Sequence, residues 1–149
     1  MELKTEQPVK VLYANFTTTL NKIHAYVGSV PEELYAEAAK SGLTPSGPQI
    51  WIYSGMTMDK DAGFDLDIAL PVSGDGTSAK YGIKELPAFK CATTMHVGPW
   101  ENLEATYQQL IGEVMKDGFK LSGIFREVYK HVDFVATEEN ITEVQAGIL

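Results

Sequence analysis

Cysteine, long apolar runs and targeting patterns are scarce or missing in this sequence. Cys91 is the single cysteine among 149 residues, so no internal disulfide can form, and its place in the strand-like run FKCATTM predicts a small buried apolar side chain. No window approaches the ~18 consecutive apolar residues of a membrane span, and the N-terminus MELKTEQPVKV lacks a basic region followed by an apolar run. We therefore expect a cytoplasmic protein that makes no membrane contact.

Basic residues are also in the minority. The 12 lysines and arginines stand against 20 aspartates and glutamates, which gives a formal net charge of −8 at pH 7. A surface of this sign repels phosphate backbones and attracts cations. The composition therefore predicts no direct binding to DNA and favours positively charged ligands.

Metal-binding and nucleophile patterns are missing as well. His24, His96 and His131 show no metal-ligand spacing, and His96 is expected to end a strand with its ring hydrogen-bonded to the backbone. The aspartates of DKDAGFDLD at 59–67 are similar to a calcium loop, but the glycine falls one place early and no glutamate stands at the twelfth place. This segment is expected to be a solvated loop that leads into an edge strand. The serines of the two Ser-Gly pairs fit no nucleophile elbow, so we expect neither a metal nor a cofactor.

What the sequence does contain is an internal repeat. The segment GLTPSGPQIWIY at 42–53 aligns without gaps with GFKLSGIFREVY at 118–129, with four identities at an offset of 76 positions. A helical pattern precedes each copy, and each helix is expected to stop at the glycine that opens the copy, Gly42 or Gly118. The coincidence of helix, cap and strand signals predicts a duplication.

Each half of the repeat reads strand, helix, strand, strand. The predicted segments are 9–17, 29–40, 48–53 and 64–72 in the first half, and 88–97, 99–117, 124–129 and 142–149 in the second. The turn-rich loop 73–82 separates the halves. We therefore predict one α+β domain over 1–149, made of two β-α-β-β halves at about 1–74 and 80–149 with pseudo-twofold symmetry. An antiparallel sheet would carry the helices on one face and a central ligand cleft on the other.

Two apolar patterns indicate which residues form the core. In FDLDIALPV the residues Leu66, Ile68 and Leu70 alternate with polar positions and share one face of a strand. On the long helix, residues at spacings of three and four define one face: Trp100, Leu103, Tyr107, Leu110 and Val114. Most of this face should pack on the sheet, while Trp100, in the first turn, should reach the rim of the cleft. Tyr13 and Phe16 of the first strand are further candidates for the rim.

A glutamate breaks the expected pattern of the strand that contains FREVY. In a strand Phe125, Glu127 and Tyr129 share one face, so a carboxylate lies between two aromatic side chains. The repeat aligns Glu127 with Trp51. It also aligns Tyr129 with Tyr53, and a twofold axis would gather all four residues in the cleft. Aromatic faces attract a flat or quaternary cation by ~0.5 to 2 kcal/mol each, and the carboxylate would supply the opposite charge.

The state of this carboxylate is left open by the residues alone. A glutamate on a strand most often faces solvent. If Glu127 is instead buried in the cleft, it must be hydrated, hydrogen-bonded to a tyrosine, or protonated when no ligand is present. Because neighbouring side chains on a strand point to opposite faces, Arg126 is then the residue expected to face solvent.

The C-terminal half carries several marks of a known family. They lie in LPAFKCATTMHVGPWENLEATYQQL, GIFREVY and TEVQAGIL, and the specific residues are His96, Gly98, Pro99, Glu127, Tyr129, Thr142 and Glu143. In these residues the chain resembles the GyrI-like, AraC-type effector-binding domain of bacterial transcription activators. The N-terminal half matches more loosely through SGPQIWIY, so the resemblance covers nearly the whole chain.

The resemblance implies a duplicated fold that binds hydrophobic, often cationic, small molecules in a central cleft. In multidrug-sensing members the glutamate matched by Glu127 pairs with the positive charge of the ligand. This chain leaves no residues for a helix-turn-helix module, so a stand-alone sensing or sequestering domain is expected, and a separate regulator could be its partner. Other relatives imply two alternatives: hydrolysis of strained electrophilic toxins by the glutamate and a nearby tyrosine, or a gyrase-inhibitor-like module that contacts a protein.

The sequence therefore predicts a small-molecule binding domain and leaves its enzymatic activity open. Glu127 is the expected anchor of the ligand. If the protein is a hydrolase, Glu127 and Tyr53 are the candidate catalytic residues. The residues expected to bind the ligand are Glu127, Trp51, Tyr53, Tyr129, Phe125, Trp100, Tyr13 and Phe16.

Overall fold

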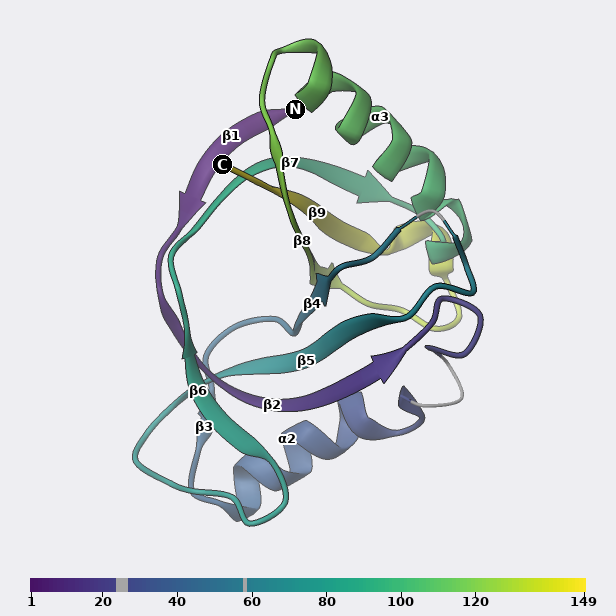
Figure 1. Cartoon of the computed structure of the whole chain (residues 1–149). Coiled ribbons are helices and arrows are strands. Elements are labelled where there is room, and N and C mark those ends of the chain that lie inside the picture. Colours follow the sequence, from purple (N-terminus) through teal and green to yellow (C-terminus); the bar gives the residue numbers. More distant parts are fainter. Residues whose placement is uncertain (24–26, 58) are drawn as a thin grey trace.

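The computed structural model describes residues 1–23, 27–57 and 59–149, so the expectation for His24 lies outside the described residues. Within these ranges the chain forms an α+β fold in which a mostly antiparallel, curled sheet carries two α-helices (Figure 1). The elements in chain order are β1 (Glu2–Glu6), β2 (Val9–Thr18), α2 (Val30–Lys40), β3 (Thr44–Pro45), β4 (Ile50–Ser54), β5 (Phe64–Ser73), β6 (Gly82–Leu86), β7 (Phe89–Val97), the 3-10 turn η1 (Trp100–Asn102), α3 (Leu103–Lys116), β8 (Leu121–His131), the 3-10 turn η2 (Thr137–Glu139) and β9 (Ile141–Ile148).

The strand order agrees with the predicted pseudo-twofold arrangement. The order is β1-β7-β9-β8-β4-β5-β2-β6, and each neighbouring pair is antiparallel. Outward from the centre, each strand of one half has a counterpart in the other: β4 with β8, β5 with β9, β2 with β7, and β6 with β1. The short β3 pairs with β5 outside this path.

The sequence does not predict the two edge strands, and each of them lies on the opposite half. β1 precedes β2 in the chain but pairs with β7, whereas β6 precedes β7 but pairs with β2. Both are short segments with few apolar residues, ELKTE and GIKEL, so neither gives a clear alternating signal. Their place in the sheet depends on pairing with distant strands.

The two central strands define where the repeat axis passes. β4 and β8 run antiparallel, with Trp51 opposite Glu127 and Tyr53 opposite Phe125. Trp51 is therefore both the repeat counterpart of Glu127 and its direct partner across the strands. With a fixed repeat offset, only one residue pair of an antiparallel ladder meets both conditions, so a local twofold axis passes between these two residues.

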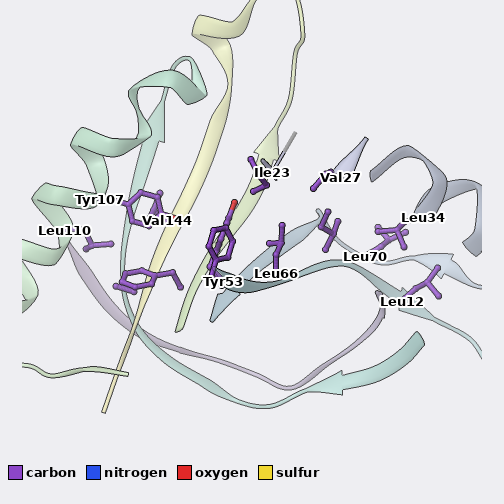
Figure 2. Packing of buried hydrophobic residues seen from close by; sticks show 14 of the residues in the cluster. Leu12, Ile23, Val27, Leu34, Tyr53, Leu66, Leu70, Tyr107, Leu110 and Val144 are labelled. Atoms are coloured by element: carbon purple, nitrogen blue, oxygen red, sulfur yellow. The ribbon is translucent and has the colours of Figure 1, made fainter. Parts of the chain in front are cut away.

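The main hydrophobic core lies between the sheet and the helices. The alternating apolar residues of β5 are completely buried there, as predicted: Leu66, Ile68 and Leu70. Figure 2 shows the core side chains in a row that extends from Leu110 on α3, past Tyr53, to Leu34 on α2. Both helices therefore pack on the same face of the sheet.

The expectation that the segment 59–67 is a loop leading into an edge strand is wrong, because β5 begins within it at Phe64 and is not an edge strand. β5 lies inside the sheet, between β4 and β2. Asp67 of β5 finds partners on the next two strands, because Asn15 Nδ2 of β2 donates a hydrogen bond to it at 2.7 Å and Lys84 Nζ of β6 lies 2.6 Å from the same carboxylate. Polar residues on one face of a strand therefore do not distinguish an edge strand from an interior one.

Both helices end where the sequence predicts. Gly42 and Gly118 have φ values of 75° and 82°, in the left-handed region that glycine adopts without strain. Within the described ranges, no helix is both long enough and apolar enough to cross a lipid bilayer.

Candidate ligand-binding site

A large cleft opens on the helix-bearing face of the sheet. It has a volume of about 1150 Å³ and lies over β4 and β8, with residues of α2 and α3 on its two sides. The expectation that the cleft lies on the face opposite the helices is therefore wrong. α3 packs on β7 and β9, and α2 packs on β5 and β2, so the helices stand apart and leave the central strands uncovered.

Aromatic side chains from both halves of the chain line this cleft. They are Tyr35, Trp51, Tyr53, Trp100, Tyr107, Phe125, Tyr129 and Phe134. Trp51 and Tyr53 come from β4, whereas Phe125 and Tyr129 come from β8. The alternation of the two strands therefore turns these residues toward the cleft together with Glu127.

Glu127 lies at the floor of the cleft and is held by three tyrosines. Glu127 is only 5% exposed. Tyr129 and Tyr53 donate hydrogen bonds to Oε1 at 2.5 and 3.2 Å, and Tyr107 donates to Oε2. None of the ion pairs within the described ranges includes Glu127. The carboxyl group is therefore satisfied by hydroxyl donors without a matching positive charge.

The surroundings of Glu127 shift its pKa upward. Burial is the largest cause, because it disfavours the charged form. The hydrogen bonds from Tyr107, Tyr129 and Tyr53 and the field of His96 act in the opposite direction but do not outweigh burial. Burial and the nearby carboxylate also raise the pKa of each of the three phenols well above the usual value, so the tyrosines remain protonated donors.

Edge-to-face ring contacts connect the floor of the cleft to its mouth. The Trp51 and Tyr129 ring centroids are 5.3 Å apart with an interplanar angle of 73°, and those of Trp100 and Tyr129 are 6.0 Å apart at 87°. Trp100 in turn contacts Phe134, which is 76% exposed, at 5.9 Å. Rings in this arrangement turn some faces toward the cleft and stiffen one another.

His96 fixes the segment that presents Trp100. Its ring nitrogens lie 2.7 Å from Thr106 Oγ1 and 3.0 Å from the carbonyl oxygen of Pro99, which confirms the expected hydrogen bond to the backbone at the end of a strand. Trp100 Nε1 also donates to Thr142 Oγ1 at 3.2 Å. These bonds hold the indole at the cleft wall, which is consistent with its predicted place at the rim.

Six of the eight residues predicted to bind a ligand line the cleft, and two do not. The six are Trp51, Tyr53, Trp100, Phe125, Glu127 and Tyr129. Tyr13 lies on the opposite face of β2, where Lys84 Nζ is 4.1 Å from its ring centroid. Phe16 packs against the main core instead. Strand alternation separates Tyr13 from the core-facing Leu12, and the sequence alone does not reveal which face of β2 the cleft uses.

Tyr107 is the residue that sequence reasoning assigns to the core without a further role. It lies on the predicted apolar face of α3 and is 8% exposed, yet its hydroxyl bonds Glu127. A signal is present, because a tyrosine in the middle of a buried stripe needs a partner for its hydroxyl group. The distant strand that supplies the partner cannot be identified from the helix alone.

Cys91 lies where it is expected, and the structure adds one grouping of polar residues that was not predicted. Cys91 is completely buried and burial raises the pKa of its thiol to about 11, as expected for an apolar filler. The possible ligand atoms of His131, Asp133 and Glu139 lie within 4.8 Å of one another near the surface, a grouping that residue spacing does not indicate. Asp133 Oδ1 already accepts hydrogen bonds from the backbone of Val135 and Ala136 at 2.8 Å each, so it holds a turn.

The fold and the cleft are those of a small-molecule binding domain. Residues 1–148 match the family model described as the GyrI-like small molecule binding domain, and the chain belongs to this family. No curated protein sequence matches the chain.

Solved structures share this fold at low sequence identity. The C-terminal domain of EcmrR gives a TM-score of 0.83 at 21% identity, covering 99% of this chain and 96% of that chain. In the EcmrR-DNA complex, the match spans 56% of the EcmrR chain. SAV2435 bound to tetraphenylphosphonium gives a TM-score of 0.66 at 15% identity, with coverage of 100% and 94%. A hydrolase from Listeria innocua gives 0.66 at 14% identity, with coverage of 99% and 91%.

Proposed function

We propose that the cleft binds amphipathic, cationic aromatic compounds, with Glu127 as the charged anchor and the surrounding rings as walls. The observation that carries this proposal is the environment of the carboxyl group. It is 5% exposed, accepts hydrogen bonds from three tyrosines and takes part in none of the ion pairs of the described ranges. It also lies at the floor of a cleft of about 1150 Å³.

A cation in the cleft would supply the charge that this site lacks. A buried carboxylate without a counter-charge is costly, which is why burial raises the pKa of Glu127. A quaternary or flat cation would stabilise the ionised form, and each aromatic face that it contacts would add ~0.5 to 2 kcal/mol. The three hydroxyl donors would keep the carboxylate oriented while the ligand binds.

The size of the cleft favours compounds with several rings. Small-molecule sites in proteins commonly have volumes of roughly 300 to 1,000 Å³, and this cleft has about 1150 Å³. Its walls are mainly apolar and aromatic, so charge and ring shape would decide recognition rather than a fixed set of hydrogen bonds. Such a site suits a domain that senses or sequesters several related cations, and a sensing role would need a regulator as partner.

Two structural neighbours support the proposal without establishing it for this chain. SAV2435 was solved bound to tetraphenylphosphonium, a cation that carries four phenyl rings. EcmrR, whose C-terminal domain shares the fold, was solved in complex with DNA. At 15% and 21% identity these similarities extend to the fold alone, so the ligand class rests on the residues of the cleft.

The proposal is tested with two probes of the same shape and opposite charge. Both tryptophans of the chain, Trp51 and Trp100, line the cleft, so their fluorescence reports on binding there. Titration of tetraphenylphosphonium is expected to saturate, whereas tetraphenylborate is expected to bind far more weakly. Glu127→Gln should weaken phosphonium binding by about 10- to 150-fold, the equivalent of roughly 1.5 to 3 kcal/mol for the loss of a close charge pair.

The matched control is Glu101→Gln, which removes the same charge from the exposed mouth of the cleft. It should change phosphonium binding by less than about threefold at 0.15 M salt, because exposed charges are screened. Equal affinities for both probes, or equal effects of the two substitutions, would rule out the anchor role of Glu127.

A hydrolase is the second candidate function, and the same carboxyl group favours it. Burial raises the pKa of Glu127 above that of an ordinary glutamate, which suits a group that exchanges protons, and Tyr53 lies at hydrogen-bond distance as an acid partner. The protein would then add water to a strained electrophile such as an activated cyclopropane. Incubation of such a compound with catalytic amounts of protein decides the matter, because no product beyond one equivalent would remove this candidate.

The third class, a gyrase-inhibitor-like module, has no observation in its favour. A closed and dry junction between the halves would support it, and the described residues form an open cleft there. This class predicts a protein partner, and it predicts that Glu127→Gln has no effect on function. The titrations above measure the effect of Glu127→Gln on phosphonium binding.

A further inference from the structure

The residue next to Glu127 is a second buried charge, on the opposite face of the sheet. The expectation that Arg126 faces solvent when Glu127 is buried is wrong, because Arg126 is only 4% exposed. Arg126 packs against Pro87 and Phe89 at the start of β7, and the β1–β2 connection and the loop before β4 line a hollow beside it. Both neighbours on the strand are therefore buried, one on each face.

Arg126 has no carboxylate partner among the described residues. None of their ion pairs includes it. Its guanidinium lies 4.1 Å above the Phe89 ring, and Nη2 reaches the carbonyl oxygen of Pro87 at a long 3.5 Å. Nε is buried without a hydrogen-bond partner. A guanidinium offers five donors in a planar fork, and here Nε lacks an acceptor while Nη2 has only the distant Pro87 oxygen.

Arg126 borders a small hollow, and another residue of its lining carries a buried acceptor without a partner. The hollow has a volume of about 200 Å³ and is lined in part by Arg126, Lys130, Glu143 and Gln145. Gln145 stands directly opposite Arg126 on β9 and is 1% exposed. Its Nε2 donates to Glu143 at 2.9 Å, but its Oε1 is buried without a donor.

The acidic groups near the hollow are already neutralised by lysines. Glu143 lies 2.5 Å from Lys4 Nζ and 3.4 Å from Lys130 Nζ, and it accepts a further hydrogen bond from Thr93 at 2.8 Å. Lys4 also pairs with Glu6 at 2.9 Å. The two carboxylates are thus paired with two lysines, and among the described residues that line the hollow the positive charge without a carboxylate partner is that of Arg126.

We propose that this hollow is a second binding site, which takes a small carboxylic acid that carries a neighbouring hydroxyl group. The carboxylate would occupy the guanidinium fork of Arg126, whose planar geometry matches its two oxygens. The hydroxyl group would donate to Gln145 Oε1. The hollow is too small for the multi-ring compounds proposed for the large cleft, and the sign of its free charge selects anions instead of cations.

The test uses glycolate, acetate and chloride on the full chain. In a two-dimensional amide NMR titration, glycolate is expected to shift signals of β8 and β9 saturably. Acetate, which lacks the hydroxyl donor, should bind about 3- to 10-fold more weakly, as the loss of one hydrogen bond implies. Chloride at equal ionic strength should give no saturable shift. Absence of saturation with glycolate, or equal shifts with all three anions, would overturn the proposal and leave water as the occupant.

Two substitutions locate the site, and a third controls for charge. Arg126→Met keeps an apolar side chain of similar length and should abolish glycolate binding without lowering the melting temperature of the ligand-free protein, because apolar replacement of a buried ion is often neutral or stabilising. Gln145→Leu should remove the preference for glycolate over acetate. Lys90→Met removes one positive charge from an exposed position of β7 and should leave both affinities unchanged. Unchanged glycolate binding in Arg126→Met, or an equal loss in Lys90→Met, would contradict the assignment.

Discussion

Two buried carboxylates on neighbouring strands of this sheet have opposite properties. Glu127 on β8 is 5% exposed and Glu143 on β9 is 1% exposed, and they face opposite sides of the sheet. For Glu143, burial by itself raises the pKa, but the bonds from Lys4, Gln145 and Thr93 outweigh it and lower the pKa to about 2. For Glu127 the donors are tyrosines and burial prevails, so the pKa is raised.

The comparison separates a carboxylate that is paired with ammonium groups from one that is bonded to phenols. Both residues are at least 95% buried, so low exposure by itself does not decide the charge state. The identity of the donors decides it, because an ammonium group brings a full charge whereas a phenol brings only a dipole. Glu143 forms ion pairs with Lys4 and Lys130, whereas no ion pair of the described residues includes Glu127.

The largest effect is expected when the complete pair is broken. Glu143→Gln should lower the free energy of unfolding at pH 7 by about 2 kcal/mol, because the buried side chain loses its charge-assisted bonds to the partly exposed ammonium groups of Lys4 and Lys130. The folded-state pKa of about 2 lies below the ordinary 4.5, so the stabilisation is present above pH 4.5 and is lost as the pH falls toward 2. Urea unfolding at pH 7 and pH 3 measures both parts. Glu6→Gln, on the exposed partner of Lys4, is the control and should cost less than about 0.5 kcal/mol.

The next effect concerns the tyrosines that distinguish Glu127 from Glu143. Tyr107→Phe and Tyr129→Phe should each weaken phosphonium binding by about 10-fold at pH 7, and Tyr53→Phe, whose bond is the longer one at 3.2 Å, by about threefold. Loss of a donor raises the pKa of Glu127 further, so part of each loss should be recovered at pH 9. A larger loss for Tyr53→Phe than for Tyr129→Phe would contradict the hydrogen-bond geometry.

A smaller effect, of opposite sign to that at Glu143, is expected on stability at Glu127. Because its folded-state pKa is raised above 4.5, the folded protein holds the extra proton and loses stability as the pH rises from 4.5 through that pKa. Glu127→Gln should therefore raise the free energy of unfolding of the ligand-free protein by about 1 kcal/mol at pH 8 and change it little at pH 4. Denaturant titrations measure this difference. If Glu127→Gln instead lowers the free energy of unfolding at pH 8, Glu127 has a counter-charge nearby and does not differ from Glu143 in this respect.

The smallest effect tests which face of β2 the ligand uses. Tyr13→Leu should leave phosphonium affinity within about twofold, because Tyr13 lies on the face away from the cleft. It should lower stability by roughly 0.5 to 1 kcal/mol through loss of the contact with Lys84. A large loss of affinity would show that the cleft extends around the edge of the sheet.

The sequence predicts most of this fold because its central strands carry strong local signals. β5 alternates cleanly, and the alignment of 42–53 with 118–129 is enough to match Trp51 with Glu127, the pair that meets across β4 and β8. Alternation also shows that Arg126 and Glu127 face opposite ways. It does not show what covers each face, so it cannot reveal that distant segments bury Arg126.

Other features depend on contacts that no local pattern encodes. The position of the cleft follows from how far apart the helices settle on the outer strands, and that separation is a property of packing. Tyr107 can be placed on the buried face of its helix by spacing, but its partner is supplied by β8. The edge strands β1 and β6 are short and polar, so only their pairing with the other half identifies them.

The exchange of these edge strands has a consequence for how the chain can be divided. The outer strand of each half of the sheet comes from the other half of the chain: β6 pairs with β2, and β1 pairs with β7. If the chain is cut in the loop between β5 and β6, the N-terminal fragment lacks β6, so one edge of β2 is left unpaired. Unpaired strand edges promote aggregation. After cleavage in this loop, the two fragments are thus expected to stay folded only when they remain associated, because each fragment contains the edge strand of the other.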